Sequence, residues 1–124
     1  MILDSDVIIE VLRGNPATMG WLRTQRAAGV ALAYSPVSRA EIRAGSRPAE
    51  RPAIASLFRS LTAIPIEAST GELAGEQLAK YARSHGVQLG DALIAASAIE
   101  SANDLATFNT RHFPGLGRVV RPDR

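Results

Sequence analysis

The chain has no cysteine, only one lysine and few aromatic residues among its 124 residues. Without cysteine, disulfides and thiolate metal sites are excluded, and a reducing compartment is the simplest setting. No apolar run approaches the roughly 20 residues that a membrane-spanning helix needs. The N-terminus also lacks the basic segment and the apolar core of a signal peptide. These absences predict a soluble, cytoplasmic protein that does not bind membranes.

Arginine supplies almost all of the positive charge. Thirteen of the fourteen basic residues are arginine, and the formal net charge is +2. The planar guanidinium fork suits phosphate groups, which favours a nucleic-acid partner. A chain that is generally rich in Ala, Gly and Arg would contain the same number without binding nucleic acid. Composition leaves both interpretations open, because arginine counts carry no positional information.

Short apolar runs alternate with helical patterns along the chain. This alternation predicts a single α/β domain, residues 1–124, with a mainly parallel sheet. The basic tail after residue 120 is expected to fray. The predicted strands cover 1–3, 30–34, 63–66, 105–108 and 119–120, and the predicted helices cover 7–12, 17–28, 37–44, 53–61, 69–84 and 91–102.

Four polar residues occur where such a fold would form a site. Asp4 follows the first strand and Asn109 follows the fourth. Glu41 lies on the helix after the second strand, and Asp91 opens an apolar helix. In open parallel sheets, ligands bind at the carboxyl ends of the strands. The sequence therefore predicts that these four side chains converge on one edge of the sheet.

Three of these residues also have an ordinary structural explanation. Asp91 is well placed as a helix N-cap or first-turn acid, since such acids complement the helix dipole. Asn109 is a common turn residue. Glu41 could be a solvated helix acid that pairs with Arg39 or Arg43. Taken singly, none of the three requires a functional site.

Asp4 is harder to explain structurally. An acid at the end of a buried strand is costly unless it is paired or bound to a cation. Asp6 either caps the first helix or joins the acids at the strand end. Clustered carboxylates repel one another, and oxygen-only ligands select Mg²⁺ or Mn²⁺. His85 and His112 lack the spacing of a zinc site and are predicted to be structural or surface residues.

Four segments together resemble the motif regions of PIN-domain ribonucleases, in particular the VapC-type toxins of bacterial toxin–antitoxin pairs. The segments are MILDSDVIIEVLRG, YSPVSRAEIRAG, GVQLGDALIAASA and DLATFNTRHFPGL. They occur in the family's order and span nearly the whole chain. The resemblance implies a PIN-like three-layer fold, in which a central sheet of four to five strands is flanked by helices. It also implies metal-dependent cleavage of RNA, such as tRNA or rRNA, that leaves a 5′-phosphate and a 3′-hydroxyl.

Site residues can be carried over from the family position by position. Asp4, Glu41 and Asp91 match the three acids that hold Mg²⁺ or Mn²⁺. Asn109 matches a fourth position, which is often aspartate in the family. A neutral amide contributes no charge to a second cation, which weakens the case for a two-metal mechanism. Ser5, Asp6 and Thr107 match supporting positions beside these residues.

The leading hypothesis is a metal-dependent endoribonuclease that acts as a toxin. Its partners would be RNA, a cognate antitoxin whose tail blocks the acidic cleft, and a second copy in a homodimer. Four arginines near the cleft are predicted to contact the RNA backbone. These arginines are Arg13, Arg43, Arg47 and Arg111.

Two alternatives use the same residues differently. A phosphatase of the haloacid-dehalogenase type would use Asp4 as nucleophile and Asp6 as acid, but that chemistry also needs a lysine and a late acidic pair. Lys80 is the only lysine, and no acid follows Asp91 until Glu100. The other alternative is a catalytically inert module that keeps only antitoxin binding.

Overall fold

Five parallel strands form one sheet, and the chain's first strand lies at its centre. The computed structural model describes all 124 residues and gives the strand order β3-β2-β1-β4-β5. Every neighbouring pair is parallel, which confirms the predicted sheet. The strands are β1 (Ile2–Leu3), β2 (Ala33–Tyr34), β3 (Thr62–Ala63), β4 (Leu105–Ala106) and β5 (Val119–Val120).

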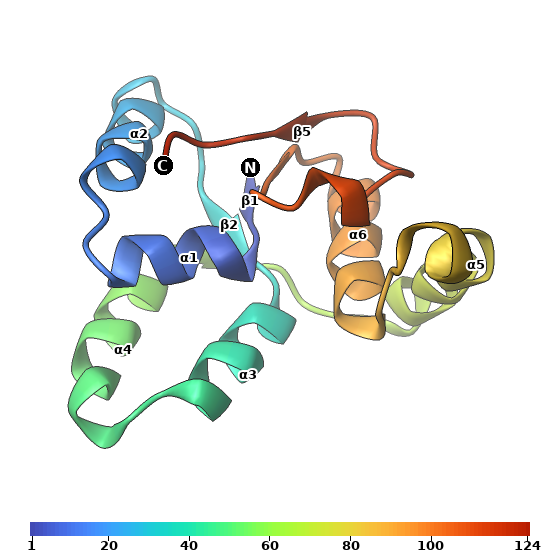
Figure 1. Ribbon diagram of the computed structural model, residues 1–124, viewed down its shortest axis with the longest axis horizontal. Helices are drawn as coiled ribbons and strands as arrows, with labels where there is room; N and C mark the ends of the chain where they lie inside the picture. The colour runs from blue at the N-terminus through green and yellow to red at the C-terminus, as the bar shows by residue number, and fades with distance from the viewer.

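Six α-helices and two short 3₁₀-helices connect and cover the strands (Figure 1). No helix combines the length and the hydropathy that crossing a bilayer requires. The α-helices are α1 (Ser5–Leu12), α2 (Pro16–Ala27), α3 (Pro36–Gly45), α4 (Arg51–Arg59), α5 (Ala68–His85) and α6 (Leu89–Ser101). The 3₁₀-helices are η1 (Pro48–Glu50) and η2 (Thr110–His112).

Alternating strand residues divide the core into the predicted three layers. Leu3 packs into a cluster with side chains from α1, α2, α3 and α4, whereas Ile2 packs on the other side with α6. Successive strand side chains point to opposite faces, so two adjacent apolar residues serve two cores. Figure 1 shows α1, α2 and α4 on one side of the sheet, with α6 on the other and α5 beyond it. α3 contributes to both sides, because Ile42 packs in the first cluster and Val37 packs against the second.

The alanines of α6 explain how one helix can serve two neighbours. Ala95 and Ala98 face the sheet, whereas Ala92 and Ala96 face α5. All four are at most 3 % exposed. Because alanine side chains are small, the sheet and α5 can both approach α6 closely. A helix that is apolar on both faces is buried between two neighbours.

Every α-helix starts one or two residues before the position that the sequence predicts. Ser35 accepts a hydrogen bond from the Val37 amide, and Pro36 occupies the first turn of α3. α1, α4 and α6 begin two residues before their predicted starts, and α1 thus begins at Ser5 rather than near Val7. Asp4 is its N-cap and accepts from the Ser5 amide at 2.8 Å. A helix starting directly after the strand brings the first turn to the sheet edge.

The C-terminal tail is packed against the protein, so the expectation that it frays is wrong. Arg121 donates a hydrogen bond to the carbonyl of Phe108 at 2.6 Å. The guanidinium of Arg124 lies 4.7 Å from the centre of the Phe108 ring. The buried Thr18 hydroxyl donates to the Asp123 carbonyl at 2.8 Å. The basic residues of the tail predicted that it is exposed to solvent. These long-range contacts instead hold the tail against α2 and against the segment that follows β4.

Candidate active site

Asp4 and Thr107 form the centre of the candidate site, at the carboxyl ends of the two central strands. The Asp4 amide donates to the Ala106 carbonyl at 2.9 Å, so the parallel pairing continues one step past β1 and β4. The Thr107 hydroxyl donates to Asp4 Oδ2 at 2.7 Å. Asp4 is 8 % exposed and Thr107 is fully buried. The sheet itself therefore fixes this pair, as the predicted strand-end site requires.

Asp6 joins the cluster from the first turn of α1. Its Oδ2 accepts from the Phe108 amide at 3.0 Å and lies 3.3 Å from Thr107 Oγ1. A hydroxyl can donate only one hydrogen bond, and the shorter distance indicates that Thr107 donates to Asp4 rather than to Asp6. Asp6 Oδ1 is buried with no hydrogen-bond partner in the protein. Asp4 is therefore the helix cap, and Asp6 is part of the acidic site.

Burial makes both carboxylates hard to ionise, and the charges of neighbouring acids add to this effect at Asp4. Burial raises the pKa of Asp4 to about 6, and the negative charges of Asp6 and Asp91 raise it as well. The hydrogen bonds from Thr107 and Ser5 act in the opposite direction. The pKa of Asp6 is also raised, chiefly by burial. A bound cation would relieve this electrostatic cost.

Glu41 reaches the same region from α3. Its Oε1 lies 3.0 Å from Ser5 Oγ, which in turn lies 2.9 Å from Ser38 Oγ. Glu41 makes no ion pair with Arg39 or Arg43, so the alternative of a surface ion pair is wrong. Ser5 thus links the helix that carries Glu41 to the turn that carries Asp4. Glu41 also lines a cavity of about 330 Å³ between α1, α3 and α4.

Asp91 is both a cap and a member of the site. Its Oδ2 accepts from the Gln88 amide at 3.1 Å, which is the capping role that the sequence suggests. The same oxygen lies 3.4 Å from His112 Nδ1, which is 2.8 Å from Asn109 Nδ2. The Asn109 amide donates to Thr107 Oγ1 at 3.0 Å, which connects this group to the centre of the site.

His112 lies at the candidate site, although the sequence does not predict it there. Its prediction as a structural or surface residue considered only the spacing of zinc ligands. In the structure, η2 brings His112 beside Asn109, because residues three apart lie together in a 3₁₀ turn. That three-residue spacing from Asn109 is the signal that could have identified it. His85 behaves as predicted and stacks edge-on against Tyr81.

The donor chemistry fits a hard cation that keeps much of its water. All the acids at the site offer oxygen, one buried carboxylate oxygen has no partner, and the pKa of Asp4 is raised. No three acidic or histidine side chains lie close enough to ligate one ion directly. Mg²⁺ commonly binds through one or two carboxylates and several waters, which this looser arrangement suits.

The four arginines predicted to contact RNA do not form one group. Arg13 pairs with Glu10 at 3.2 Å and lines the cavity that also contains Glu41. Arg111 lies in η2, next to His112. Arg47 is the N-cap of η1, and Arg43 lines a separate cavity between α3 and α4. Of these four arginines, only Arg13 lines a cavity together with a residue of the acidic site.

The raised pKa of Asp4 predicts a pH-dependent stability in the absence of metal. Folded Asp4 binds its proton more tightly than unfolded Asp4, whose pKa is near 4. The resulting stabilisation is present at low pH and is lost as the pH rises through about 6. We expect Asp4 to lower the free energy of unfolding by about 1 kcal/mol between pH 5 and pH 7 in EDTA.

Urea unfolding at both pH values would measure this difference. The Asp4→Asn variant should lose this part of the pH dependence, whereas Glu72→Gln, an exposed acid on α5, should keep it. An unchanged pH dependence in Asp4→Asn would show that Asp4 does not titrate in this range.

Comparison with known proteins identifies relatives along nearly the whole chain. A family model described as "PIN domain" matches residues 1–118. The chain is 43 % identical over 123 residues to Ribonuclease VapC10 of Mycobacterium tuberculosis, covering 98 % of this chain and 92 % of that protein. It is 33 % identical over 114 residues to Ribonuclease VapC19 of the same organism, covering 91 % of each.

Solved structures share the fold. A protein in a toxin–antitoxin complex from Klebsiella pneumoniae superposes with a TM-score of 0.78 at 21 % sequence identity, covering 98 % of this chain and 96 % of that one. At that identity, the likeness concerns the fold, and it agrees with the parallel sheet and the flanking helices described above.

Proposed function

Because the chain belongs to the PIN-domain family, we propose that it is a metal-dependent endoribonuclease and the toxin of a toxin–antitoxin pair. The observation that carries the proposal is the acidic cluster at the carboxyl edge of the sheet. Asp4 and Asp6 are held there with raised pKa values beside Asp91. The substrate class follows from the two relatives, both of which are named ribonucleases.

Asp4, Glu41 and Asp91 are the residues that would hold Mg²⁺ or Mn²⁺, directly or through water. The bound ion supplies positive charge that offsets the charge on the attacked phosphate and lowers the pKa of water. Asn109 is neutral and favours a single resident ion. Three further residues support the site through hydrogen bonds. Ser5 holds Glu41 in place, and Thr107 holds Asp4. Asp6 holds the backbone at Phe108.

Asp91 is better placed than Asp4 to accept a proton from the attacking water. Both oxygens of Asp4 already accept hydrogen bonds from Ser5 and Thr107. Asp91 uses only Oδ2, for Gln88 and His112, so its Oδ1 has no protein partner. A carboxylate oxygen with no other hydrogen bond can act as a general base.

Family membership overturns the phosphatase alternative but leaves the inert module open. The complete set of Asp4, Glu41 and Asp91 favours catalysis over a module that has lost it. An antitoxin partner is supported by the toxin–antitoxin complex that shares the fold. We also propose that the protein forms a homodimer, that residues 1–124 form a single domain, and that the target is tRNA or rRNA.

Cleavage of a total RNA pool by the purified protein tests the proposed function. We expect discrete fragments of tRNA or rRNA with Mg²⁺, and none in excess EDTA. Isothermal titration with Mn²⁺ measures metal binding separately. Metal binding without cleavage of any RNA would support the inert module.

A further inference from the structure

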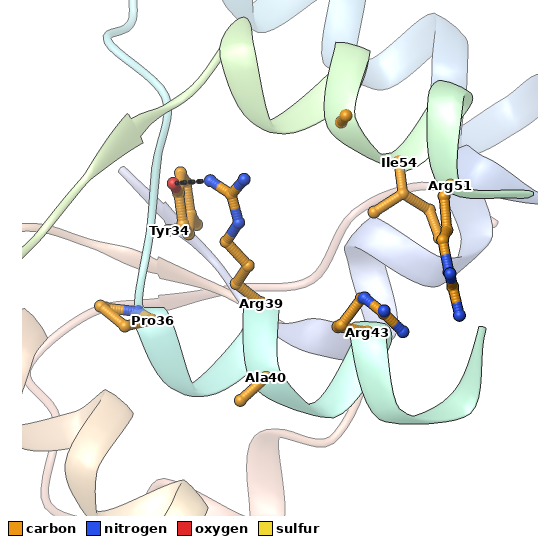
Figure 2. Close-up of a pocket in the computed structure, with 8 residues that line it drawn as sticks. Tyr34, Pro36, Arg39, Ala40, Arg43, Arg51 and Ile54 are labelled. Atoms are coloured by element: carbon orange, nitrogen blue, oxygen red, sulfur yellow. Dashed lines mark hydrogen bonds between the residues drawn. The ribbon is translucent and has the colours of Figure 1, made fainter. Parts of the chain in front are cut away.

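A cavity of about 580 Å³ lies between α3 and α4, away from the acidic site (Figure 2). An α-helix turns about 100° per residue, so Arg39 and Arg43 share one face of α3, whereas Glu41 lies on the other. α3 therefore presents an acid to the candidate active site and arginines to this cavity. The lining residues are Tyr34, Pro36, Arg39, Ala40, Arg43, Arg51, Ile54 and Ala55.

The cavity carries three positive charges and no negative one. Arg39 is fixed in place, because it donates to the Tyr34 hydroxyl at 3.0 Å and lies 5.2 Å from the centre of the Phe58 ring. Arg43 and Arg51 reach from facing helices into the same space, as Figure 2 shows. None of the three arginines belongs to any of the four ion pairs in the protein. The unpaired charges favour an anionic ligand.

The remaining lining side chains are apolar. Pro36 and Ala40 on α3 face Ile54 and Ala55 on α4. Arginine forks bind phosphate oxygens, and guanidinium planes also stack on the flat faces of bases. Sites for single-stranded nucleic acid use positively charged grooves that follow the backbone, and arginine contributes to the stacking on bases.

The acidic site makes cationic contacts elsewhere necessary. Asp4, Asp6, Glu41 and Asp91 repel phosphate groups, and Arg13 is already paired with Glu10. Affinity for RNA must therefore come largely from arginines outside the acidic cluster. The cavity gathers three such arginines only one helix width, about 10 Å, from Glu41.

We propose that Arg39, Arg43 and Arg51 form a second RNA-contacting site, which binds a backbone phosphate and an adjoining base of the substrate. The RNA passes around α3 between this cavity and the acidic site. The inference rests on the proposed ribonuclease function and adds a binding site to it. Arg43 was expected at the acidic cleft, and the structure instead places it with Arg39 and Arg51.

Binding of single-stranded RNA in EDTA tests this site independently of cleavage. The probe is a fluorescein-labelled RNA of mixed sequence, about 12 nucleotides long, within the range that one domain covers. The double variant Arg43→Gln/Arg51→Gln should raise Kd about tenfold. It should also reduce the slope of log Kd against log salt by about 0.7 for each phosphate that the variant no longer neutralises.

A charge-matched double variant controls for net charge. Arg23→Gln/Arg83→Gln removes two exposed arginines, on α2 and α5. It should change Kd less than about threefold. Equal weakening by both double variants would overturn the proposal, since bulk charge would then explain the binding. Polyglutamate serves as a second probe. If the cavity double variant loses polyglutamate binding but binds RNA as the wild type does, the proposal is overturned in favour of an acidic protein partner.

The test separates this inference from the proposed function. If wild-type protein cleaves RNA but the cavity variant binds RNA normally, the cavity inference fails and the nuclease stands. If wild-type protein never cleaves RNA but the cavity variant binds RNA more weakly than the control, the cavity site stands and the nuclease fails.

Discussion

We expect Asp91→Asn to lower the rate of RNA cleavage by about 100-fold or more at saturating Mg²⁺. The amide keeps the size of the side chain but removes its charge, and with it the proposed proton acceptor at Oδ1. It also weakens the charge that holds the ion. Initial rates on an RNA identified from the total pool would measure the loss.

The fold should survive this substitution. The asparagine side chain would still accept from the Gln88 amide, so the start of α6 loses only a charge–dipole contribution of about 0.3–1 kcal/mol. Glu72→Gln on α5 is the matched control, because it removes one exposed carboxylate far from the site. Cleavage by Asp91→Asn at more than half the wild-type rate would remove Asp91 from the mechanism.

Thr107→Val should lower cleavage about 10- to 100-fold without rearranging the sheet. Valine has nearly the same shape, but it cannot donate to Asp4 Oδ2 or accept from the Asn109 amide. Because Thr107 is fully buried, water cannot replace these bonds. The free energy of unfolding should also fall by about 1–3 kcal/mol.

Thr107→Ser separates the hydroxyl from the methyl group. It keeps both hydrogen bonds and should retain cleavage within about threefold of wild type, although it loses a buried methyl group. If serine and valine impair cleavage equally, packing rather than the hydroxyl positions Asp4. Rates measured with a single RNA, together with urea unfolding of both variants, would distinguish these cases.

Helix positions were largely predictable because their signals are local. The Ser35–Pro36 start of α3 and the Gly86 end of α5, with φ of 66°, both follow from the nearest residues. Strand lengths were less predictable. The run 30–34 contains only two strand residues, Ala33 and Tyr34, because apolar runs report burial rather than ladder pairing. The packed tail likewise depends on contacts with distant residues.

The identity of the acids at the site was predictable from the sequence, but the hydrogen bonds that connect them were not. Parallel strands place Asp4 and Asn109 at one edge by rule, and the structure agrees. Their links through Thr107 and His112 depend on side-chain geometry that a sequence does not contain. The same limit applies to arginines, since a residue count could not separate the paired Arg13 from the unpaired Arg43.

The central position of β1 makes the candidate site depend on pairing between distant parts of the chain. Asp4 precedes Thr107, its hydrogen-bond donor, by 103 residues along the chain. A nascent chain that stops before β4 has neither the neighbouring strand nor the completed acidic site. The candidate site can therefore form only after segments that are far apart in the chain have paired, and any fragment without β4 should lack it.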